Sequence, residues 1–143
     1  MDGVKGIPAN FSPHAAVLMG SAMEQIRATF AAEDWNGLRQ SHFRLLTSVP
    51  AQGISITDLA ELLRMTKQGC GQFVASLTES GYLIATENPT DRRARIVRRT
   101  ALGDRTVLAV NERIFRIEQN WAQLVGQRRY ATFRRVLLEL SDG

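Results

Sequence analysis

Hydrophobic residues recur at helical spacing through the first part of the chain. Apolar side chains fall every three or four positions over residues 15–30, after Ser12-Pro13, a capping residue followed by a proline suited to a first helical turn. Asn36-Gly37 interrupts this pattern, and a second amphipathic stretch covers residues 39–49. The pattern predicts two helices separated by a short turn.

A pair of short helices with a tight turn is predicted next. Residues 55–58 read Ser-Ile-Thr-Asp, a capping box that precedes the apolar residues of 59–63. Arg64-Met65 makes the turn, and Thr66 caps a second helix over residues 66–80 that Gly81 ends. Two helices joined by about three residues form a helix-turn-helix unit, whose second helix can enter a DNA major groove.

Alternation replaces the helical period after Gly81. Residues 82–87 predict a strand, residues 88–91 a turn, and residues 95–99 a returning strand. A helix-turn-helix followed by such a hairpin is a winged helix. We therefore expect a mainly α fold with a small β-hairpin wing, in which residues 37–100 form the DNA-binding domain.

A long helix capped by Thr100 follows, and Gly126 separates it from a last helix. In the long helix, the apolar positions from Val107 to Leu124 are spaced by three and four residues, as in a coiled-coil seam. The seam could pack inside the monomer, but the winged helix is already a closed unit, so we expect residues 12–36 and 101–141 to form a helical dimerisation region. The expected dimer contacts are Leu18, Val107, Val110, Ile114, Ile117, Trp121, Phe133 and Leu137.

The positive charge of the chain is concentrated near the predicted wing. The formal net charge is +4, and residues 91–105 contain six Arg and two Asp, which accounts for the whole excess. Arginine suits phosphate and groove contacts because its planar guanidinium stays charged and donates two hydrogen bonds at once. A solvated basic loop is the alternative interpretation.

Other classes of protein find little support in the sequence. With one cysteine and two histidines, an intrachain disulfide is excluded and a Cys/His zinc site nearly so. No apolar run approaches the ~18 residues of a membrane span, and the N-terminus lacks a signal-peptide pattern. Catalytic motifs and phosphate-binding glycine loops are missing. We expect a cytoplasmic protein that is not an enzyme and needs no metal or cofactor.

Taken together, several motifs resemble the MarR (multiple-antibiotic-resistance regulator) family of bacterial repressors. They are Leu59-Ala60, Met65-Thr66-Lys67-Gln68, Leu77, Gly81-Tyr82, Asp91-Arg92-Arg93-Ala94-Arg95, Val97, Thr100 and Gly103. The resemblance implies a homodimeric winged-helix protein that binds an inverted repeat, often released by a small phenolic or amphipathic ligand or by cysteine oxidation. The chain departs from the family at Arg99, where Leu is usual, at Ala85 and Thr86, where basic residues are usual, and at Gly69 and Gly71.

The predicted DNA contacts come from the second helix of the helix-turn-helix unit and from the wing. The first turns of that helix provide the major-groove candidates Thr66, Lys67, Gln68, Gly71 and Gln72. Of these, the two glutamines are the expected base readers, because a carboxamide can pair bidentately with adenine, and their alternative is solvated surface. In the wing, the resemblance assigns Arg93 to the minor groove and Asp91 to its orientation. Arg92 and Arg95 are candidates for phosphate contacts.

Three further residues have two interpretations each. Adjacent Arg98 and Arg99 face opposite sides of a strand, and at least one could pair with an acid such as Glu87. Cys70 fits a small buried hydrophobe better than a redox sensor, which needs access and a lowered pKa. No effector residues are identified.

Two functions from different classes follow. The first is a homodimeric sequence-specific transcriptional regulator, with a repressor role favoured, that reads an inverted repeat with helix 66–80 and wing 88–95. The second is a winged-helix protein-interaction module, such as an anti-repressor, that no longer reads DNA.

Overall fold

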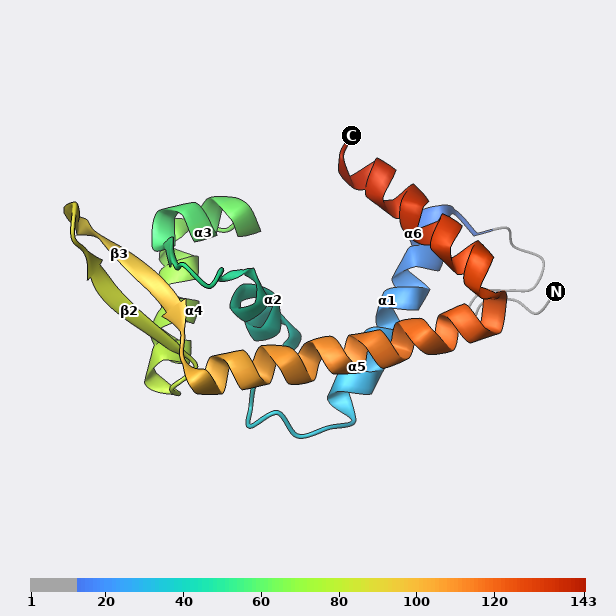
Figure 1. The fold of residues 1–143 in the computed structure, drawn as a ribbon, viewed down its shortest axis with the longest axis horizontal. Coiled ribbons are helices and arrows are strands. Elements are labelled where there is room, and N and C mark those ends of the chain that lie inside the picture. The colour runs from blue at the N-terminus through green and yellow to red at the C-terminus, as the bar shows by residue number, and fades with distance from the viewer. Residues whose placement is uncertain (1–12) are drawn as a thin grey trace. The chain divides into compact units, whose positions relative to one another are not determined.

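A computed structural model describes residues 13–143, apart from the side chain of Arg92. The chain forms two compact units, residues 1–40 and 41–143. The order of the elements can be followed by colour from blue to red in Figure 1. The prediction of a mainly helical fold with a small β wing is confirmed.

The first unit contains helix α1 (Ala15–Ala31). It begins two residues later than the Ser12-Pro13 pattern predicts, because His14 is still extended at ψ 153° and occupies the N-cap position. Ser12 itself lies outside the described residues. Near the end of α1, the buried Phe30 packs its ring against Trp35, with 5.5 Å between the ring centroids.

The helices of the winged unit follow the predicted order closely. They are α2 (Gln40–Ser48), α3 (Ile56–Leu63) and α4 (Lys67–Glu79). Gly81 ends this region at φ +88°, in the left-handed conformation that its lack of a side chain allows. The predicted helix-turn-helix unit is therefore present.

A three-stranded antiparallel sheet forms the wing and its base. Its order is β1 (Ile54–Ser55), β3 (Asp91–Arg99) and β2 (Leu83–Asn88), so β3 is the central strand. The hairpin β2–β3 is the predicted one, although β3 begins at Asp91 rather than at Arg95. Strand β1 was not predicted, and it pairs Ile54 with Val97.

The core of the winged unit is built from the inward faces of its helices and strands. Apolar side chains from α2, α3, α4, β2, β3 and α5 (Ala101–Val125) meet there. The most deeply buried of these are Leu45, Leu46, Val49, Leu59, Cys70, Leu77, Leu83 and Val97. These residues pack α4 and the wing against one core. The backbone positions from which the exposed side chains of both elements extend are therefore fixed relative to each other.

Helix α5 and helix α6 (Gln127–Ser141) are separated where predicted, at Gly126, which has φ +94°. Some side chains of the predicted seam of α5 are buried and others are exposed. Val107, Val110 and Ile117 are buried within the single chain. These three predicted dimer contacts are thus already covered by side chains of their own chain. Further along, Leu124 is 83% exposed.

Candidate nucleic-acid interface

Two side-chain caps and one left-handed residue shape the helix-turn-helix unit. Asp58 donates its backbone N–H to the Ser55 hydroxyl over 3.1 Å, which begins α3 as the capping box predicts. Arg64 then takes φ +53°, and this reverses the chain between the helices. The Thr66 hydroxyl accepts the backbone N–H of Gly69 over 3.0 Å, which fixes the first residue of α4.

The two faces of α4 differ as the sequence predicts. Cys70, Val74 and Leu77 are buried on the inner face. The predicted DNA-contacting residues lie on the outer part of the same helix: Thr66, Lys67, Gln68 and Gln72 are exposed, and Gly71 is half-buried. A ring contact with His42, 5.3 Å between centroids, covers Phe73. The first turns of α4 therefore expose two glutamine side chains, while the inner face of the helix packs into the core.

Cys70 is buried, as expected for a small hydrophobic residue. Burial raises the pKa of the Cys70 thiol, because a thiolate loses hydration inside the protein. A reactive cysteine needs the opposite, a lowered pKa and access to solvent. The structure therefore favours the packing role over the redox role.

The glycines beside Cys70 have different surroundings. A Cβ atom on Gly69 would lie 3.0 Å from the Thr66 hydroxyl oxygen, so this glycine leaves room for the capping hydroxyl. A Cβ atom on Gly71 would have no neighbouring atom within 4 Å. Close contact with the capping hydroxyl therefore explains why position 69 is a glycine, whereas nothing in the packing requires a glycine at position 71.

The tip of the wing is held by local hydrogen bonds. Thr90 donates both its N–H and its hydroxyl to the side-chain oxygen of Asn88. Asp91 accepts the backbone N–H of Arg93 over 3.0 Å. This bond holds the backbone of Arg93, whereas the predicted brace acts on its guanidinium. The side chain of Arg92 is not among the described ones.

The arginines of β3 divide into exposed and anchored side chains. Arg93 and Arg95 are exposed, and Arg95 lies opposite Glu87 in the hairpin register. Arg98 donates to the Thr86 hydroxyl over 3.2 Å. The expectation that one of the last two arginines pairs with an acid is met by Arg99. Its partner is Asp104 rather than the suggested Glu87.

A pocket of about 410 Å³ lies between α4 and the wing. It brings together two residues that the sequence singled out separately, Gly71 from α4 and Arg95 from β3. Ala85 of β2, noted in the sequence for standing where a basic residue is usual, lines it as well. No motif in the sequence marks the remaining wall residues, although several of them recur on one side of α4. The full lining is Ile56, Gly71, Val74, Ala75, Thr78, Glu79, Ala85 and Arg95.

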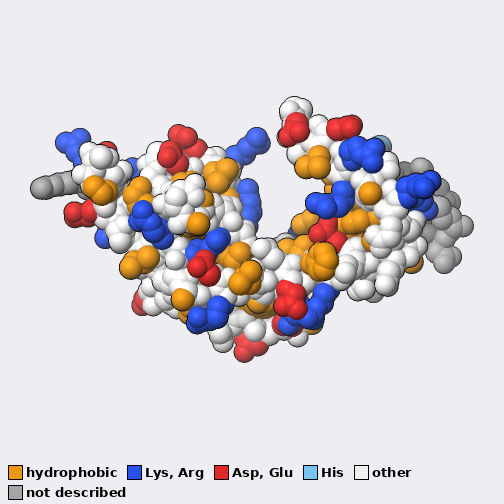
Figure 2. All heavy atoms as spheres, in the orientation of Figure 1, with side chains coloured by type: hydrophobic (Ala, Val, Ile, Leu, Met, Phe, Trp, Pro, Cys, Tyr) orange, Lys and Arg blue, Asp and Glu red, His pale blue; other side chains and the backbone are white. Residues whose placement is uncertain are grey.

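Basic side chains are a visible feature of this part of the surface. Figure 2 shows blue Lys and Arg side chains at the wing tip on the left and over the adjoining helices.

Within residues 13–143, no group of three or more His, Cys, Asp or Glu side chains could hold a metal ion. None of the helices in that range is long and apolar enough to cross a membrane.

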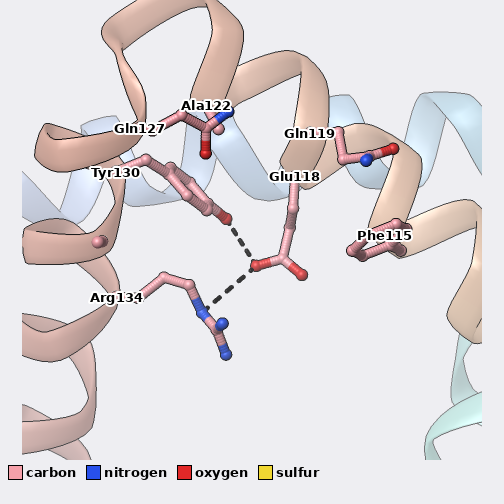
Figure 3. A pocket seen from close by; sticks show the side chains of 8 residues that line it. Phe115, Glu118, Gln119, Ala122, Gln127, Tyr130 and Arg134 are labelled. Atoms are coloured by element: carbon pink, nitrogen blue, oxygen red, sulfur yellow. Dashed lines mark hydrogen bonds and ion pairs between the residues drawn. The ribbon is translucent and has the colours of Figure 1, made fainter.

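A second pocket, of about 340 Å³, lies in the elbow between α5 and α6. Figure 3 shows Tyr130 and Arg134 of α6 directed toward Glu118 of α5. The Tyr130 hydroxyl donates to the Glu118 carboxylate over 2.6 Å, and the Arg134 guanidinium lies 3.8 Å from the same oxygen. Burial and the hydrogen bond to Glu118 raise the pKa of Tyr130 to about 12. These polar contacts join α5 and α6 across the elbow.

Comparison with known proteins relates the helix-turn-helix unit and the wing to one protein family. The sequence profile of the MarR family matches residues 36–94, which span α2 to the wing tip. This stretch resembles the MarR family, as the sequence motifs predict. Members of this family are transcriptional regulators and not enzymes. No curated protein matches the sequence significantly.

Solved structures of MarR-family regulators share the fold over nearly the whole chain. A structure of MarR is 18% identical with a TM-score of 0.80, and the match covers 96% of this chain and 94% of that one. PcaV from Streptomyces coelicolor, in complex with its natural ligand, is 17% identical with a TM-score of 0.73 over 96% and 98%. The S. aureus MepR–DNA complex is 12% identical with a TM-score of 0.75 over 92% and 98%.

Proposed function

We propose that this protein is a homodimeric, sequence-specific DNA-binding transcriptional regulator that acts as a repressor. The observation that carries the proposal is the pairing of a capped, exposed helix start at α4 with an arginine-bearing wing on the same rigid sheet and core. The relation to MepR, which has been solved with DNA, supports it. Such a regulator would act in the cytoplasm, where bacterial DNA lies.

In this proposal, α4 reads bases and the wing reads groove shape. Gln68 and Gln72 pair with base edges in the major groove, while Thr66 and Lys67 bind phosphate. Gly71 allows the backbone to come close to the bases. Arg93 enters the minor groove beside the site, because a narrow A·T-rich groove attracts a guanidinium electrostatically.

The remaining wing residues support this contact. Asp91 fixes the direction of Arg93, and Arg92 and Arg95 bind phosphate. Winged helix 37–100 is thus the DNA-binding domain of the proposal.

The dimer would form through helical residues 12–36 and 101–141. Large apolar side chains remain uncovered there, which is typical of an interaction surface. We assign the contact with the partner to the predicted residues that are not fully buried in the chain, namely Leu18, Ile114, Trp121, Phe133 and Leu137. The elbow pocket beside Phe115 offers a recess for a partner's side chain.

Release of the DNA would follow from a change in the distance between the two copies of α4. We propose a small amphipathic or phenolic effector, since the related PcaV has been solved with a natural ligand. A panel of phenolic acids added to a preformed protein–DNA complex tests this point. Persistence of the complex with every member of the panel would count against such an effector.

The deciding experiment selects bound sequences from a random duplex library at moderate salt. A palindromic consensus with half-sites about one helical turn apart is the expected result. Recovery of no consensus by a folded dimer would overturn the proposal and favour the interaction module. Salt provides a second criterion, because phosphate contacts release counterions and the affinity should fall steeply as salt rises.

Arg93→Ala tests the wing directly. We expect operator affinity to fall about tenfold or more, without loss of thermal stability, because the side chain is exposed. Arg116→Ala is the matched control, since it removes the same charge from an exposed pair with Glu112 on α5. Equal binding by Arg93→Ala and wild type would refute the role of the wing.

A further inference from the structure

The end of the wing, the end of α4 and the start of α5 meet at one tightly connected point. We call this point the α5 junction and define it as residues 81–82 and 99–104. The Thr100 hydroxyl donates to the Gly81 carbonyl over 2.6 Å, and the Thr100 N–H donates to the Tyr82 carbonyl over 3.1 Å. Gly103 lies so close that a Cβ atom on it would be 2.2 Å from the Tyr82 carbonyl oxygen.

Arg99 adds a charged connection across the α5 junction. Its Nε lies 2.9 Å from the Asp104 carboxylate in the first turn of α5, and its Nη1 donates to the Leu46 carbonyl near the end of α2 over 3.3 Å. The Arg99 side chain is 19% exposed, and that of Asp104 is 60% exposed. One guanidinium therefore links β3, α2 and α5.

Both partners of Arg99 lie at helix ends, where the helix dipole favours an interaction with charge. The Leu46 carbonyl belongs to the last turn of α2, where backbone carbonyls lack intrahelical donors and a cation is favourable. Asp104 lies in the first turn of α5, where a carboxylate is favourable. A leucine at position 99 could make neither contact, so the link is a property of this chain.

We propose that Arg99 is a positioning residue that fixes the wing and α4 relative to α5, and thereby sets the half-site spacing that the dimer accepts. This inference rests on the proposed function, in which α5 leads to the dimer contact and α4 reads DNA. Arg99 itself touches no DNA in this proposal. It acts by preventing the winged helix from turning about the first residues of α5.

The test measures binding to operators in which the distance between half-sites is changed one base pair at a time. Wild type should prefer one spacing, because one extra base pair turns a half-site by about a tenth of a helical turn. In Arg99→Met, which keeps the length of the side chain without its charge, this preference should flatten. We expect the ratio between the best and the neighbouring spacing to fall severalfold.

Three further variants separate positioning from general stability. Asp104→Asn removes the ion pair and leaves Arg99 in place, so it reports on the link even if Arg99→Met folds poorly. Arg99→Lys keeps the charge but lacks the planar fork that reaches both partners, so it should restore part of the preference. Arg105→Met removes an exposed positive charge next to the α5 junction and should leave the preference unchanged.

The two proposals fail in different ways. If wild type binds no operator, the proposed function is wrong. If wild type prefers one spacing and both Arg99→Met and Asp104→Asn keep that preference in full, the inference about Arg99 is wrong. A lowered melting temperature with an unchanged spacing preference would likewise reduce Arg99 to a structural residue and overturn the inference.

Discussion

Replacing Gly71 by alanine should make the protein more stable. A glycine within a helix costs up to about 1 kcal/mol relative to alanine, because it loses more backbone freedom on folding. A Cβ atom at this position would meet no atom within 4 Å, so nothing in the fold opposes it. We expect the free energy of unfolding to rise by about 0.5–1 kcal/mol, which corresponds to about 2–4 °C in melting temperature for a chain of this size.

Gly69→Ala is the matched comparison on the same turn. There the new methyl group would lie 3.0 Å from the Thr66 hydroxyl, which caps α4. Displacing a capping hydroxyl costs about 1 kcal/mol, which offsets the gain in helix propensity. We therefore expect Gly69→Ala to stay within about 0.5 kcal/mol of wild type, well below the gain at Gly71.

Denaturant unfolding followed by circular dichroism measures both variants, at one protein concentration because dimerisation would shift the midpoint. Operator binding by the same samples should weaken for Gly71→Ala, since the added methyl group separates the backbone from the bases. A variant that is more stable and binds less tightly would assign Gly71 to recognition. A Gly71→Ala protein less stable than wild type, or a gain at Gly69 equal to that at Gly71, would refute the reasoning.

Three further predictions concern other positions. Gly103→Ala forces a methyl group against the Tyr82 carbonyl and should cost about 1–3 kcal/mol or more, measured as a lower denaturation midpoint. Tyr130 binds its proton more tightly when folded, with a pKa of about 12 against about 10 unfolded, so stability should fall as pH rises from about 10 to 12. Tyr130→Phe should reduce that fall, and an identical pH profile would contradict it. Cys70 should react with iodoacetamide only on unfolding, and fast labelling of the native protein would disprove its burial.

The helix-turn-helix unit could be predicted because its signals are local. Ser55 and Thr66 cap helices through hydroxyl groups that bond a few residues away, and Gly81 takes the left-handed conformation for which glycine is suited. Such signals need no knowledge of the rest of the chain. They therefore gave correct boundaries for α3 and α4 to within about two residues.

The spacing of hydrophobic and polar residues does not predict contacts between segments that are distant in the sequence. Strand β1 has two residues, too few to show an alternation, and it forms because Gly53 lets the chain pass against Ile96. The hydrogen bond from Arg99 to the Leu46 carbonyl joins residues 53 positions apart, which no local pattern indicates. Periodicity also grouped Val107 with Leu124 on one seam, but it does not say which of them the chain itself buries.

The unequal support of β3 along its length has a mechanical consequence. Near its base, β3 has a neighbour on each side, since Ile96 and Val97 pair with both β1 and β2. Toward the tip only β2 accompanies it, and the register shifts between Glu87 and Asn88. The wing is thus a cantilever, clamped at one end and compliant at the other. In the proposed complex with DNA, the tip would follow grooves of different width by bending, and the elastic cost would stay outside the core.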